Sequence, residues 1–290
     1  MNLFILIPSS LTIESQDLKI KTYKVAQIAR AVSVFRVDKI IIYKDRDYND
    51  SKFISTILKY AETPQYLRKR LFALKKDLKY AGIIPPLRTP HHPINSESSN
   101  LKIGDFRVGV VTKVLKNGAS RVCWVDIGVE RPALLQAKVR EGETLNFRIV
   151  SIRPLKVELV NKKDIPLYWG YQTELANGLY ETLKTLKKNS LVIATSKKGE
   201  VLDINLLKKI GQKMHKSNNT SIIFGSPIKG LDEILSTSFF LKSKKISDLS
   251  DYVINTIPNQ GTETVRTEEA IFATLAQLNL VRSELRKGEE

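Results

Sequence analysis

The chain of 290 residues has little cysteine and little histidine, which limits the chemistry it can perform. Cys123 is the only cysteine, and there are three histidines. A single cysteine forms no intramolecular disulfide and no cysteine-based metal cluster. Because no histidine lies near Cys123 in the sequence, we expect it in a core or at the neighbouring surface rather than as a nucleophile. The sequence also lacks HExxH, CxxC and DxDxDG patterns, so it predicts no metal site.

Long apolar runs and glycine-rich nucleotide motifs are missing as well. No apolar run reaches the ~18 residues that span a bilayer, which predicts no membrane partner. The first ten residues are apolar without a basic leader and predict a strand rather than a signal peptide. The absence of GxGxxG and GxxxxGK[ST] motifs argues against a site that binds NAD, FAD or a nucleoside triphosphate. We therefore expect a soluble, cytoplasmic protein.

Acidic residues are too few to balance the basic ones. Lys and Arg number 47 against 30 Asp and Glu, which gives a net charge of +17 and a pI near 9.7. Such a charge favours a polyanionic partner, here RNA or DNA, and disfavours an enzyme that acts on a small nucleotide.

Apolar strands alternate with helices at both ends of the chain, which predicts an α/β fold. Residues 3–7, 17–35 and 38–43 read as strand, helix and strand, the unit of a parallel sheet. After residue 166 the pattern returns. We predict a helix over 174–187, a strand over 191–195, a polar loop over 195–200 and a helix over 206–214. Residues 221–227 are expected to form a strand that runs into a Gly-Pro turn, and a short helix is predicted over 231–235.

A basic helix is predicted over residues 65–80, after a helix over 53–61. Leu67, Leu71, Leu74 and Leu78 recur at helical spacing, and cations occupy the other positions. The basic face is either a solvated surface or a phosphate contact, and the net charge favours phosphate.

The stretch between these parts predicts a small β-barrel. Residues 101–163 show five short alternating strands with turns at Asn117-Gly118, Gly128 and Gly142, as in an OB-like fold. Thirteen basic and six acidic residues in this stretch suit single-stranded nucleic acid. Trp124, Phe106 and Phe147 would stack on bases or pack in the core. The predicted domains are therefore 1–95 with 166–290, interrupted by 100–164.

Two histidines stand together in a proline-rich turn over residues 82–93. Adjacent His91 and His92 point in different directions and are poor joint metal ligands. A rigid turn where two domains meet is favoured over a catalytic role.

One C-terminal stretch, residues 252–270, predicts a ligand site. An apolar strand ends at Pro258, Gly261 allows a sharp turn, and Thr267 stands at a helix N-cap before Glu268 and Glu269. Loops 195–200, 224–230 and 257–266 would all leave the carboxyl ends of parallel strands, where open sheets bind ligands.

Four motifs resemble one family. They are Ile7-Pro8-Ser9-Ser10, Leu87-Arg88-Thr89-Pro90-His91-His92-Pro93, Phe224-Gly225-Ser226-Pro227 and the 252–270 stretch. In order and content they resemble the SPOUT class of RNA methyltransferases, in the archaeal and eukaryotic family with an OB-like insertion. The resemblance implies a parallel-sheet domain with a C-terminal trefoil knot. It also implies a homodimer, with helix 268–285 as a dimer face, although a core helix would have the same sequence.

The resemblance also implies a cofactor and site residues. S-adenosylmethionine would lie against Thr195, Gly225, Asn255, Ile257, Pro258, Gly261, Thr262 and Val265. Arg30, Glu263 and Arg266 are the catalytic expectations. Alternatively, Glu263 and Arg266 form an ion pair at the helix start, and Arg30 is a surface charge. Thr264-Val265-Arg266-Thr267 departs from the Ser-Leu-Asn of the better-known SpoU group, so the catalytic Asn of that group has no counterpart here.

The predicted function is S-adenosylmethionine-dependent methylation of RNA, with ribosomal RNA or another structured RNA as substrate. The residues expected to bind RNA are Arg68, Lys69, Arg70, Lys75, Lys76, Arg107 and Arg121. The alternative is a non-catalytic RNA-binding or ribosome-assembly factor that has kept the fold.

Overall fold

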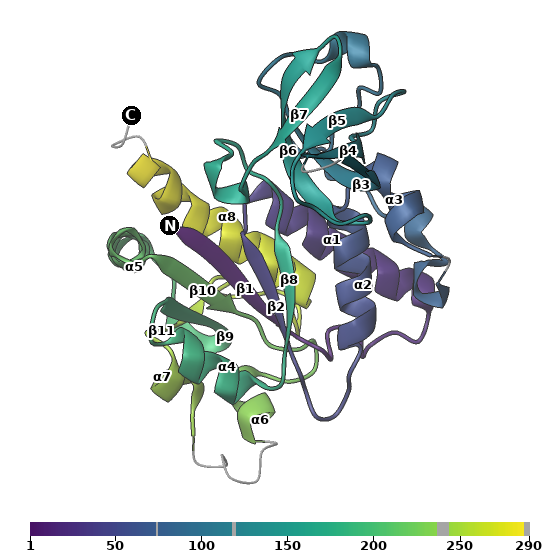
Figure 1. The fold of residues 1–290 in the computed structure, drawn as a ribbon. Coiled ribbons are helices and arrows are strands. Elements are labelled where there is room, and N and C mark those ends of the chain that lie inside the picture. The colour runs from purple at the N-terminus through teal and green to yellow at the C-terminus, as the bar shows by residue number, and fades with distance from the viewer. Residues whose placement is uncertain (74, 118–119, 237–243, 287–290) are drawn as a thin grey trace. The chain divides into compact units, whose positions relative to one another are not determined.

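The computed structural model describes the chain except residues 74, 118–119, 237–243 and 287–290, and it leaves the side chains of 116–117, 120–121 and 284–286 undescribed. The chain forms two compact units. The first comprises Met1–Ala61, Lys75–Pro85 and Tyr171–Glu290, and the second comprises Glu62–Leu74 and Pro86–Gly170. Figure 1 labels their elements.

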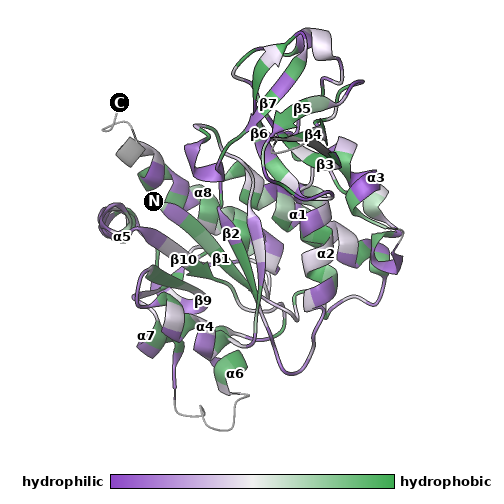
Figure 2. Cartoon of the chain, viewed as in Figure 1, coloured by the Kyte–Doolittle hydropathy of each residue, from purple (hydrophilic) through white to green (hydrophobic). Residues whose placement is uncertain are grey.

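The first unit is built on a six-stranded sheet with the order β11-β9-β10-β1-β2-β8. All its strand pairs are parallel. The strands are β1 (Asn2–Pro8), β2 (Lys39–Tyr43), β8 (Gln172–Ala176), β9 (Leu191–Val201), β10 (Asn219–Ile223) and β11 (Tyr252–Asn255). The apolar runs in β1 and β2 become central strands in which every apolar residue except the half-buried Phe4 is buried, as parallel sheets require, and Figure 2 shows β1 as largely hydrophobic. The α/β prediction is confirmed.

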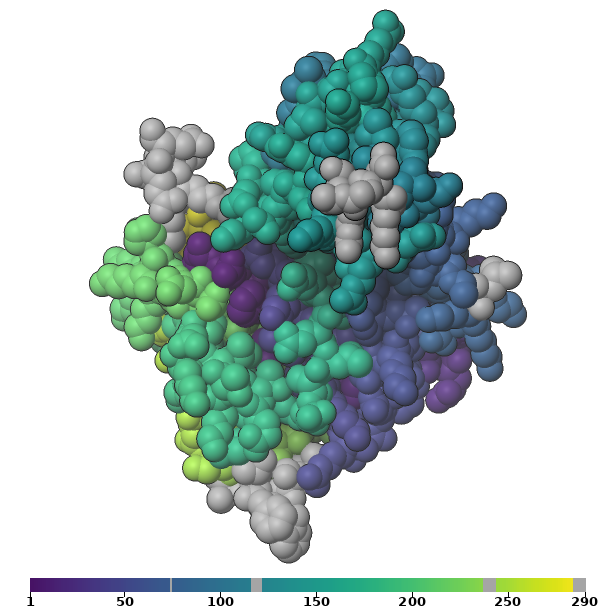
Figure 3. Space-filling view, viewed as in Figure 1, coloured from purple at the N-terminus to yellow at the C-terminus, as the bar shows by residue number. Residues whose placement is uncertain are grey.

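Helices cover both faces of this sheet. They are α1 (Leu18–Val34), α2 (Ser51–Glu62), α4 (Leu179–Leu186), α5 (Ile204–Lys216), α6 (Leu231–Ser236), α7 (Ile246–Leu249) and α8 (Thr267–Arg286). Helix α8 packs against α1 and α5, while α4, α6 and α7 pack together over the other face. On that face Leu6 of β1 lies in one cluster with Leu183 of α4 and Leu235 of α6. Figure 3, in the same view as Figure 1, shows teal-green side chains of the region around α4 at the surface.

The start of α1 follows its sequence signal. The Asp17 carboxylate accepts hydrogen bonds from the backbone N–H groups of Lys19 and Ile20, at 2.6 and 3.1 Å. This is the N-cap arrangement that satisfies the first donors of a helix. The predicted helix over 17–35 is therefore confirmed to within a residue at each end.

The second unit contains a closed barrel with the strand order β3-β4-β5-β7-β6. The strands are β3 (Phe106–Asn117), β4 (Ser120–Asp126), β5 (Ala133–Gln136), β6 (Thr144–Ile152) and β7 (Leu155–Leu159). Cys123 and Phe147 are fully buried in its core. Gly128 and Gly142 have positive φ, as their predicted turns require, while the Asn117-Gly118 turn extends beyond the described residues. The five-stranded, OB-like barrel is confirmed.

A short helix, α3 (Gln65–Leu71), belongs to the unit that contains the barrel. The Tyr66 hydroxyl donates to the Val108 carbonyl at 2.7 Å, and the Tyr66 ring lies over Gly128, where a Cβ would meet ring carbons at 2.4 Å. Arg70 lies 3.5 Å from the Asp126 carboxylate. The helix is thus attached to the barrel at both of its ends.

The predicted helix over 65–80 is wrong beyond Leu71. Phe72 has extended backbone angles, and the described residues from 73 to 83 form only short 3-10 turns, at Lys76–Leu78 and Ala81–Ile83. Like charges at helical spacing, such as Lys75 and Lys79, disfavour a continuous helix there. Further 3-10 turns lie at Ser98–Asn100 and Lys162–Asp164.

The predicted helix over 174–187 is also wrong at its start. Residues 172–176 form the edge strand β8, which pairs with β2, and α4 begins only at Leu179. Gly178 separates the two with an extended backbone, φ −178°. Leucine spacing alone could not distinguish an edge strand followed by a short helix from one longer helix.

Candidate functional site

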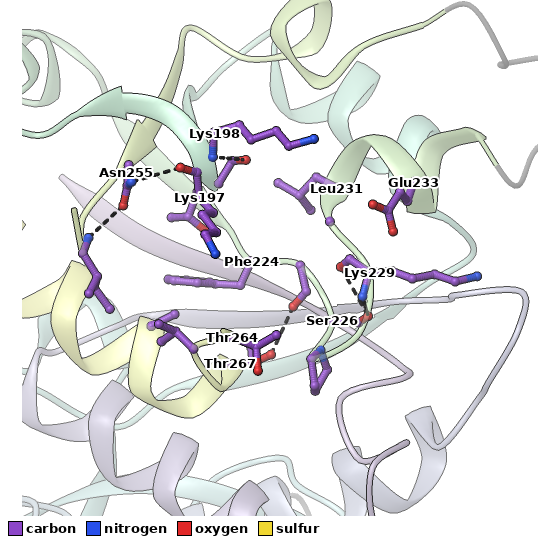
Figure 4. Close-up of a pocket in the computed structure, with 18 of the residues that line it drawn as sticks. Lys197, Lys198, Phe224, Ser226, Lys229, Leu231, Glu233, Asn255, Thr264 and Thr267 are labelled. Carbon is purple, nitrogen blue, oxygen red and sulfur yellow. Dashed lines mark hydrogen bonds between the residues drawn. The ribbon is translucent and has the colours of Figure 1, made fainter. Parts of the chain in front are cut away.

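A pocket of about 390 Å³ lies where β9, β10 and β11 end. It belongs entirely to the first unit. The lining residues come from four stretches, drawn in part in Figure 4, and a few single positions: 195–198, 224–233, 254–257 and 263–265, with Ile246, Gln260, Thr267 and Ala270. The three stretches that we expected at the carboxyl ends of these strands therefore line the same pocket.

One wall is a bulge in β9, where the sequence predicted a loop over 195–200. Pairing with β11 jumps from Ala194 to Glu200 while β11 advances by one residue, from Val253 to Ile254. Residues 195–199 therefore bow out of the sheet but remain part of the strand, which corrects the loop prediction. Gly199 permits this, because a Cβ there would lie 2.6 Å from the backbone carbon of Ile254.

The bulge is held at its first residue and at its middle by hydrogen bonds. The Thr195 hydroxyl donates to the Ile223 carbonyl at 2.8 Å, and the Asn255 side-chain amide donates to the Lys197 carbonyl at 3.0 Å. These contacts link the bulge to β10 and β11, so the polar stretch 195–198 keeps a fixed place along the wall (Figure 4).

The second wall is a tight turn after β10. Backbone N–H of Ser226 donates to the Lys229 carbonyl at 3.0 Å, and backbone N–H of Lys229 donates to the Ser226 hydroxyl at 2.9 Å. The buried Tyr43 hydroxyl donates to the Phe224 carbonyl at 2.7 Å. Burial raises the pKa of Tyr43 well above its usual value, so the phenol stays a donor.

The third wall is the loop between β11 and α8. The Gln260 side-chain amide donates to the carbonyls of Thr262 and Glu263, at 2.8 and 2.9 Å, and Lys197 Nζ donates to the Glu263 carbonyl at 3.1 Å. The residue with positive φ in this loop is Asn259, not Gly261 as the sequence suggested. Asparagine tolerates that conformation better than most residues.

Helix α8 begins at Thr267, which has a different role from the predicted N-cap. Its hydroxyl donates to the Gly225 carbonyl at 3.1 Å and so ties the helix start to the turn after β10. The backbone N–H of Arg266 donates instead to the Glu269 carboxylate at 3.0 Å. Three loops distant in sequence are thereby joined around one pocket.

The structure brings together most, but not all, of the predicted cofactor residues. Thr195, Gly225, Asn255, Ile257 and Val265 line the pocket. Pro258, Gly261 and Thr262 belong to the third wall but lie exposed and outside the lining.

The three predicted catalytic residues are placed differently from one another. Glu263 lines the pocket, and Arg266 is exposed at the start of α8. Arg30 lies on α1, half-buried and outside the lining. Among the described residues Glu263 and Arg266 form no ion pair with each other.

Sequence reasoning missed several charged residues of the pocket. Lys197, Lys198 and Lys229 line it together with Asp232 and Glu233. Lys229 also forms an ion pair with Asp47. The available signal for the lysines was their position in the predicted loops 195–200 and 224–230, whereas Asp232 and Glu233 belong to α6 and gave no such signal.

The residues predicted to bind RNA divide into exposed and buried groups. Lys69 is exposed and Arg70 is 53% exposed on α3, while Arg68 donates to the Thr63 carbonyl at 2.9 Å. Lys75 and Lys76 are exposed in the first unit. Arg107 is only 5% exposed and donates to the Asn95 carbonyl at 3.2 Å. The side chain of Arg121 lies outside the described residues.

The histidine pair has a structural position within the second unit. His91 is buried, and its Nε2 lies 3.2 Å from a carboxylate oxygen of Glu62. His92 Nε2 contacts the Glu62 carbonyl. Burial lowers the pKa of His92 to about 3, so this ring is neutral near pH 7 and holds backbone rather than exchanging protons.

Two further findings concern metals and membranes. In the part of the chain that the structure describes, no three His, Cys, Asp or Glu residues come together as a metal site. No helix among the described residues is long and apolar enough to cross a bilayer.

A parallel α/β sheet with a pocket at three strand ends, joined in sequence to a closed five-stranded barrel, agrees with the SPOUT class that carries an OB-like insertion. The chain belongs to the family described as "Putative RNA methyltransferase", which it matches over residues 2–278. It is therefore an RNA methyltransferase, an enzyme that needs a methyl donor.

Comparison with individual proteins supports this membership. An uncharacterised protein of Halobacterium salinarum is 37% identical over 95% of this chain and 98% of its own length. The 28S rRNA (uridine-N(3))-methyltransferase of Mus musculus is 30% identical over 95% of this chain and 75% of its own. The human protein of the same name is 29% identical over 95% of this chain and 77% of its own.

Proposed function

We propose that this enzyme uses S-adenosylmethionine to methylate N3 of a uridine in ribosomal RNA. The observation that carries the proposal is the pocket enclosed by β9, β10 and β11, in a chain similar to rRNA (uridine-N(3))-methyltransferases over nearly its whole length.

The pocket suits this methyl donor in size and charge. Its volume of about 390 Å³ falls within the ~300–1,000 Å³ of ordinary ligand sites. Lysines and acids both line it, which fits a ligand whose tail carries an ammonium and a carboxylate. Thr195, Gly225, Asn255, Ile257 and Val265 would contact the donor, while Pro258, Gly261 and Thr262 would shape the loop around it. When bound, S-adenosylmethionine supplies a methyl group already activated by its sulfonium.

The protein must then orient uracil and remove its N3 proton. Glu263 lines the pocket and is the proposed proton acceptor. Lys197 and Lys198 line the same pocket, so their ammonium groups would stabilise negative charge on the uracil oxygens. Arg30 and Arg266 would hold the RNA backbone near the target. Orientation supplies most of the remaining rate.

The higher organisation of the enzyme is part of the same proposal. Residues 1–95 and 166–290 form the methyltransferase domain with a trefoil knot, and 100–164 form an RNA-binding insertion. The enzyme works as a cytoplasmic homodimer. Support for the dimer comes from α1, where Ile20, Tyr23 and Val34 are each about half exposed, and from Leu280 of α8, which is 61% exposed. Such apolar side chains suit a subunit interface.

Calorimetric titration with S-adenosylmethionine, with ATP and NAD as controls, tests the cofactor. Selective micromolar binding, about −8 kcal/mol, is expected. Gly225→Val should abolish it, because a Cβ at this position already lies 3.0 Å from the Lys229 carbonyl, whereas Gly82→Val has open space and should bind normally. Selective binding of ATP or NAD instead would contradict the proposal.

Methyl transfer to ribosomal RNA tests the reaction. A methyl group on N3 blocks Watson–Crick pairing, so the product should stop reverse transcription at one uridine. Glu263→Gln should lower the transfer rate by ~10²-fold or more while leaving cofactor affinity near wild type. RNA binding without any cofactor binding would favour the alternative, a non-catalytic RNA-binding factor.

A further inference from the structure

One row of side chains crosses four strands of the barrel. Lys113 of β3 is in register with Trp124 of β4, Trp124 with Leu134 of β5, and Leu134 with Lys156 of β7. Paired residues on neighbouring strands project to the same face, and strands lie ~4.8 Å apart. The row therefore places the indole beside Lys113 on one neighbouring strand, with Lys156 two strands away on the other side, beyond Leu134.

This surface is the outside of the barrel. Cys123, Val125, Leu135 and Val157, which flank the row along their strands, are at most 4% exposed and lie in the barrel core. Because successive side chains alternate between faces, the row points outward. Lys113 and Lys156 are accordingly exposed, and Trp124 is half-buried.

Other large rings of the second unit pack against residues of that unit. Phe147 is fully buried in the core. Trp169 is 5% exposed and donates its indole N–H to Asn146 at 2.8 Å, and Phe106 packs edge-on against it, with ring centroids 6.1 Å apart. Of the three rings that the sequence offered for stacking, Phe147 lies in the core and half-buried Phe106 packs on Trp169, while half-buried Trp124 lies on the outer face in register with Lys113.

The charge around the row is positive. The nearest acids along these strands, Asp126 and Glu158, are paired with Arg70 at 3.5 Å and with Arg148 at 2.6 Å. The contact of Asp126 also brings α3, with Lys69 and Arg70, to the end of β4. Cations therefore continue from the row onto the helix.

We propose that this row is a stacking platform for an unpaired nucleotide of the RNA substrate. The base would lie on the indole of Trp124, while Lys113 and Lys156 contact phosphates on either side. Single-stranded RNA fits better than a duplex, because only an unpaired base has a free face to stack. The inference rests on the proposed function only in taking RNA as the substrate, and it assigns to the barrel the choice of unpaired segments.

The two tryptophans of the chain make the proposal measurable by fluorescence. In Trp169→Phe the remaining emission comes from Trp124, and a single-stranded oligouridine should quench it. In Trp124→Phe the remaining emission comes from Trp169, and the same oligouridine should leave it unchanged. Quenching that persists in Trp124→Phe and is absent from Trp169→Phe would overturn the proposal.

Binding of a labelled oligonucleotide tests the platform without relying on Trp169. Trp124→Ala should weaken binding about tenfold or more, as loss of a base stack does. Lys113→Glu and Lys156→Glu should also weaken it, whereas Lys163→Glu, an exposed lysine outside the row, should have less effect. Affinity unchanged in Trp124→Ala, or a duplex bound as tightly as the single strand, would overturn the platform.

Cofactor titration of the same variants separates the two proposals. Trp124→Ala should bind S-adenosylmethionine like wild type, because the pocket contains no residue of the barrel. Failure of cofactor binding in every variant, with fluorescence quenching intact, would overturn the proposed function and support the platform.

Discussion

Individual polar side chains determine how α3 and the barrel hold together. Tyr66 of α3 is the clearest case, because its hydroxyl donates to the Val108 carbonyl and its ring packs on Gly128. Burial raises the pKa of Tyr66 well above its usual value, so the hydroxyl remains a donor to Val108 over the whole physiological range.

Removal of that hydroxyl should destabilise the second unit. Tyr66→Phe keeps the ring over Gly128 but leaves the Val108 carbonyl without its donor, at a cost of about 1 kcal/mol. Urea unfolding followed by the fluorescence of Trp124 and Trp169, which both lie in the same unit, measures the change. Tyr80→Phe in the first unit is the control and should leave this transition in place. An unaltered midpoint for Tyr66→Phe would show that the hydrogen bond contributes nothing.

Glu268, in the first turn of α8, is a buried carboxylate with a cost that depends on pH. Its side chain is 9% exposed, and Oε2 has no hydrogen-bond partner among the described residues. Burial raises its pKa above the usual value of 4.5, so the folded protein takes up a proton more readily than the unfolded chain. The folded state is therefore penalised as pH rises through the unfolded and then the folded pKa.

Glu268→Gln should remove that penalty. The variant should melt at a higher temperature than wild type at pH 8, and the difference should shrink as the pH falls below about 4.5, where wild-type Glu268 is protonated in both states. Thermal unfolding of both proteins across this range gives the comparison, with the exposed Glu200→Gln as control. A difference that grows toward low pH would contradict the argument.

Among the elements, β9 departs furthest from its sequence pattern. The polar run from Thr195 to Glu200 has the composition of a loop, yet it is part of the strand. It bulges away from β11, and the Asn255 side chain holds it by a hydrogen bond to the Lys197 carbonyl. The central strands were predictable because burial on both faces demands an unbroken apolar run. A bulge has no comparable pattern in the sequence, because it depends on the close approach of Gly199 to a strand more than fifty residues later.

The same distinction applies to the candidate site and the barrel. Asn255 and Val265 could be expected in the pocket from the strand–turn–helix pattern, while Asp232 and Glu233 could not, because they lie on α6, beyond the loops that the sequence indicated. Arg107 counted as surface charge in the sequence but lies buried against Asn95, a contact between a strand and the segment before it. Alternation predicted the strands of the barrel, and only register revealed which rings face outward.

Gly199→Ala should distort the bulge. An added Cβ would lie 2.6 Å from one backbone atom and 2.8 Å from another, and backbone cannot move as a side-chain end can. We expect a loss of about 1–3 kcal/mol in unfolding free energy, together with weaker cofactor binding, because the bulge lines the pocket. Denaturant unfolding and calorimetry measure both effects. Gly82→Ala, with nothing within 4 Å, is the matched control.

At the scale of the whole molecule, the first unit presents apolar side chains that its own packing does not cover. Ile20, Tyr23 and Val34 are each about half exposed along α1, which also packs against α8. A second copy of the chain would remove these side chains from water, in keeping with the proposed homodimer.

Tyr23→Glu should dissociate that dimer. A carboxylate at the centre of an apolar interface would be desolvated without a partner, at a cost large enough to shift the equilibrium to monomer. Light scattering after size-exclusion chromatography should show the mass fall by half, while thermal unfolding of the monomer remains cooperative. The control is Lys52→Glu, at an exposed lysine of α2 that is not one of these apolar positions of α1. This variant should remain dimeric. A wild-type protein with the mass of one chain would refute the dimer.

The strand order β11-β9-β10-β1-β2-β8 also has a consequence for the time at which each unit can form. Strand β1 leaves the ribosome first, but its partner β10 follows more than two hundred residues later, since Leu3 pairs with Thr220. All strand pairs of the barrel fall between Phe106 and Leu159. Local pairings close sooner than distant ones, because their loop-closure entropy is smaller. During synthesis all strands of the barrel can therefore pair before β10 has been made. Until then the edge of β1 that pairs with β10 remains unpaired.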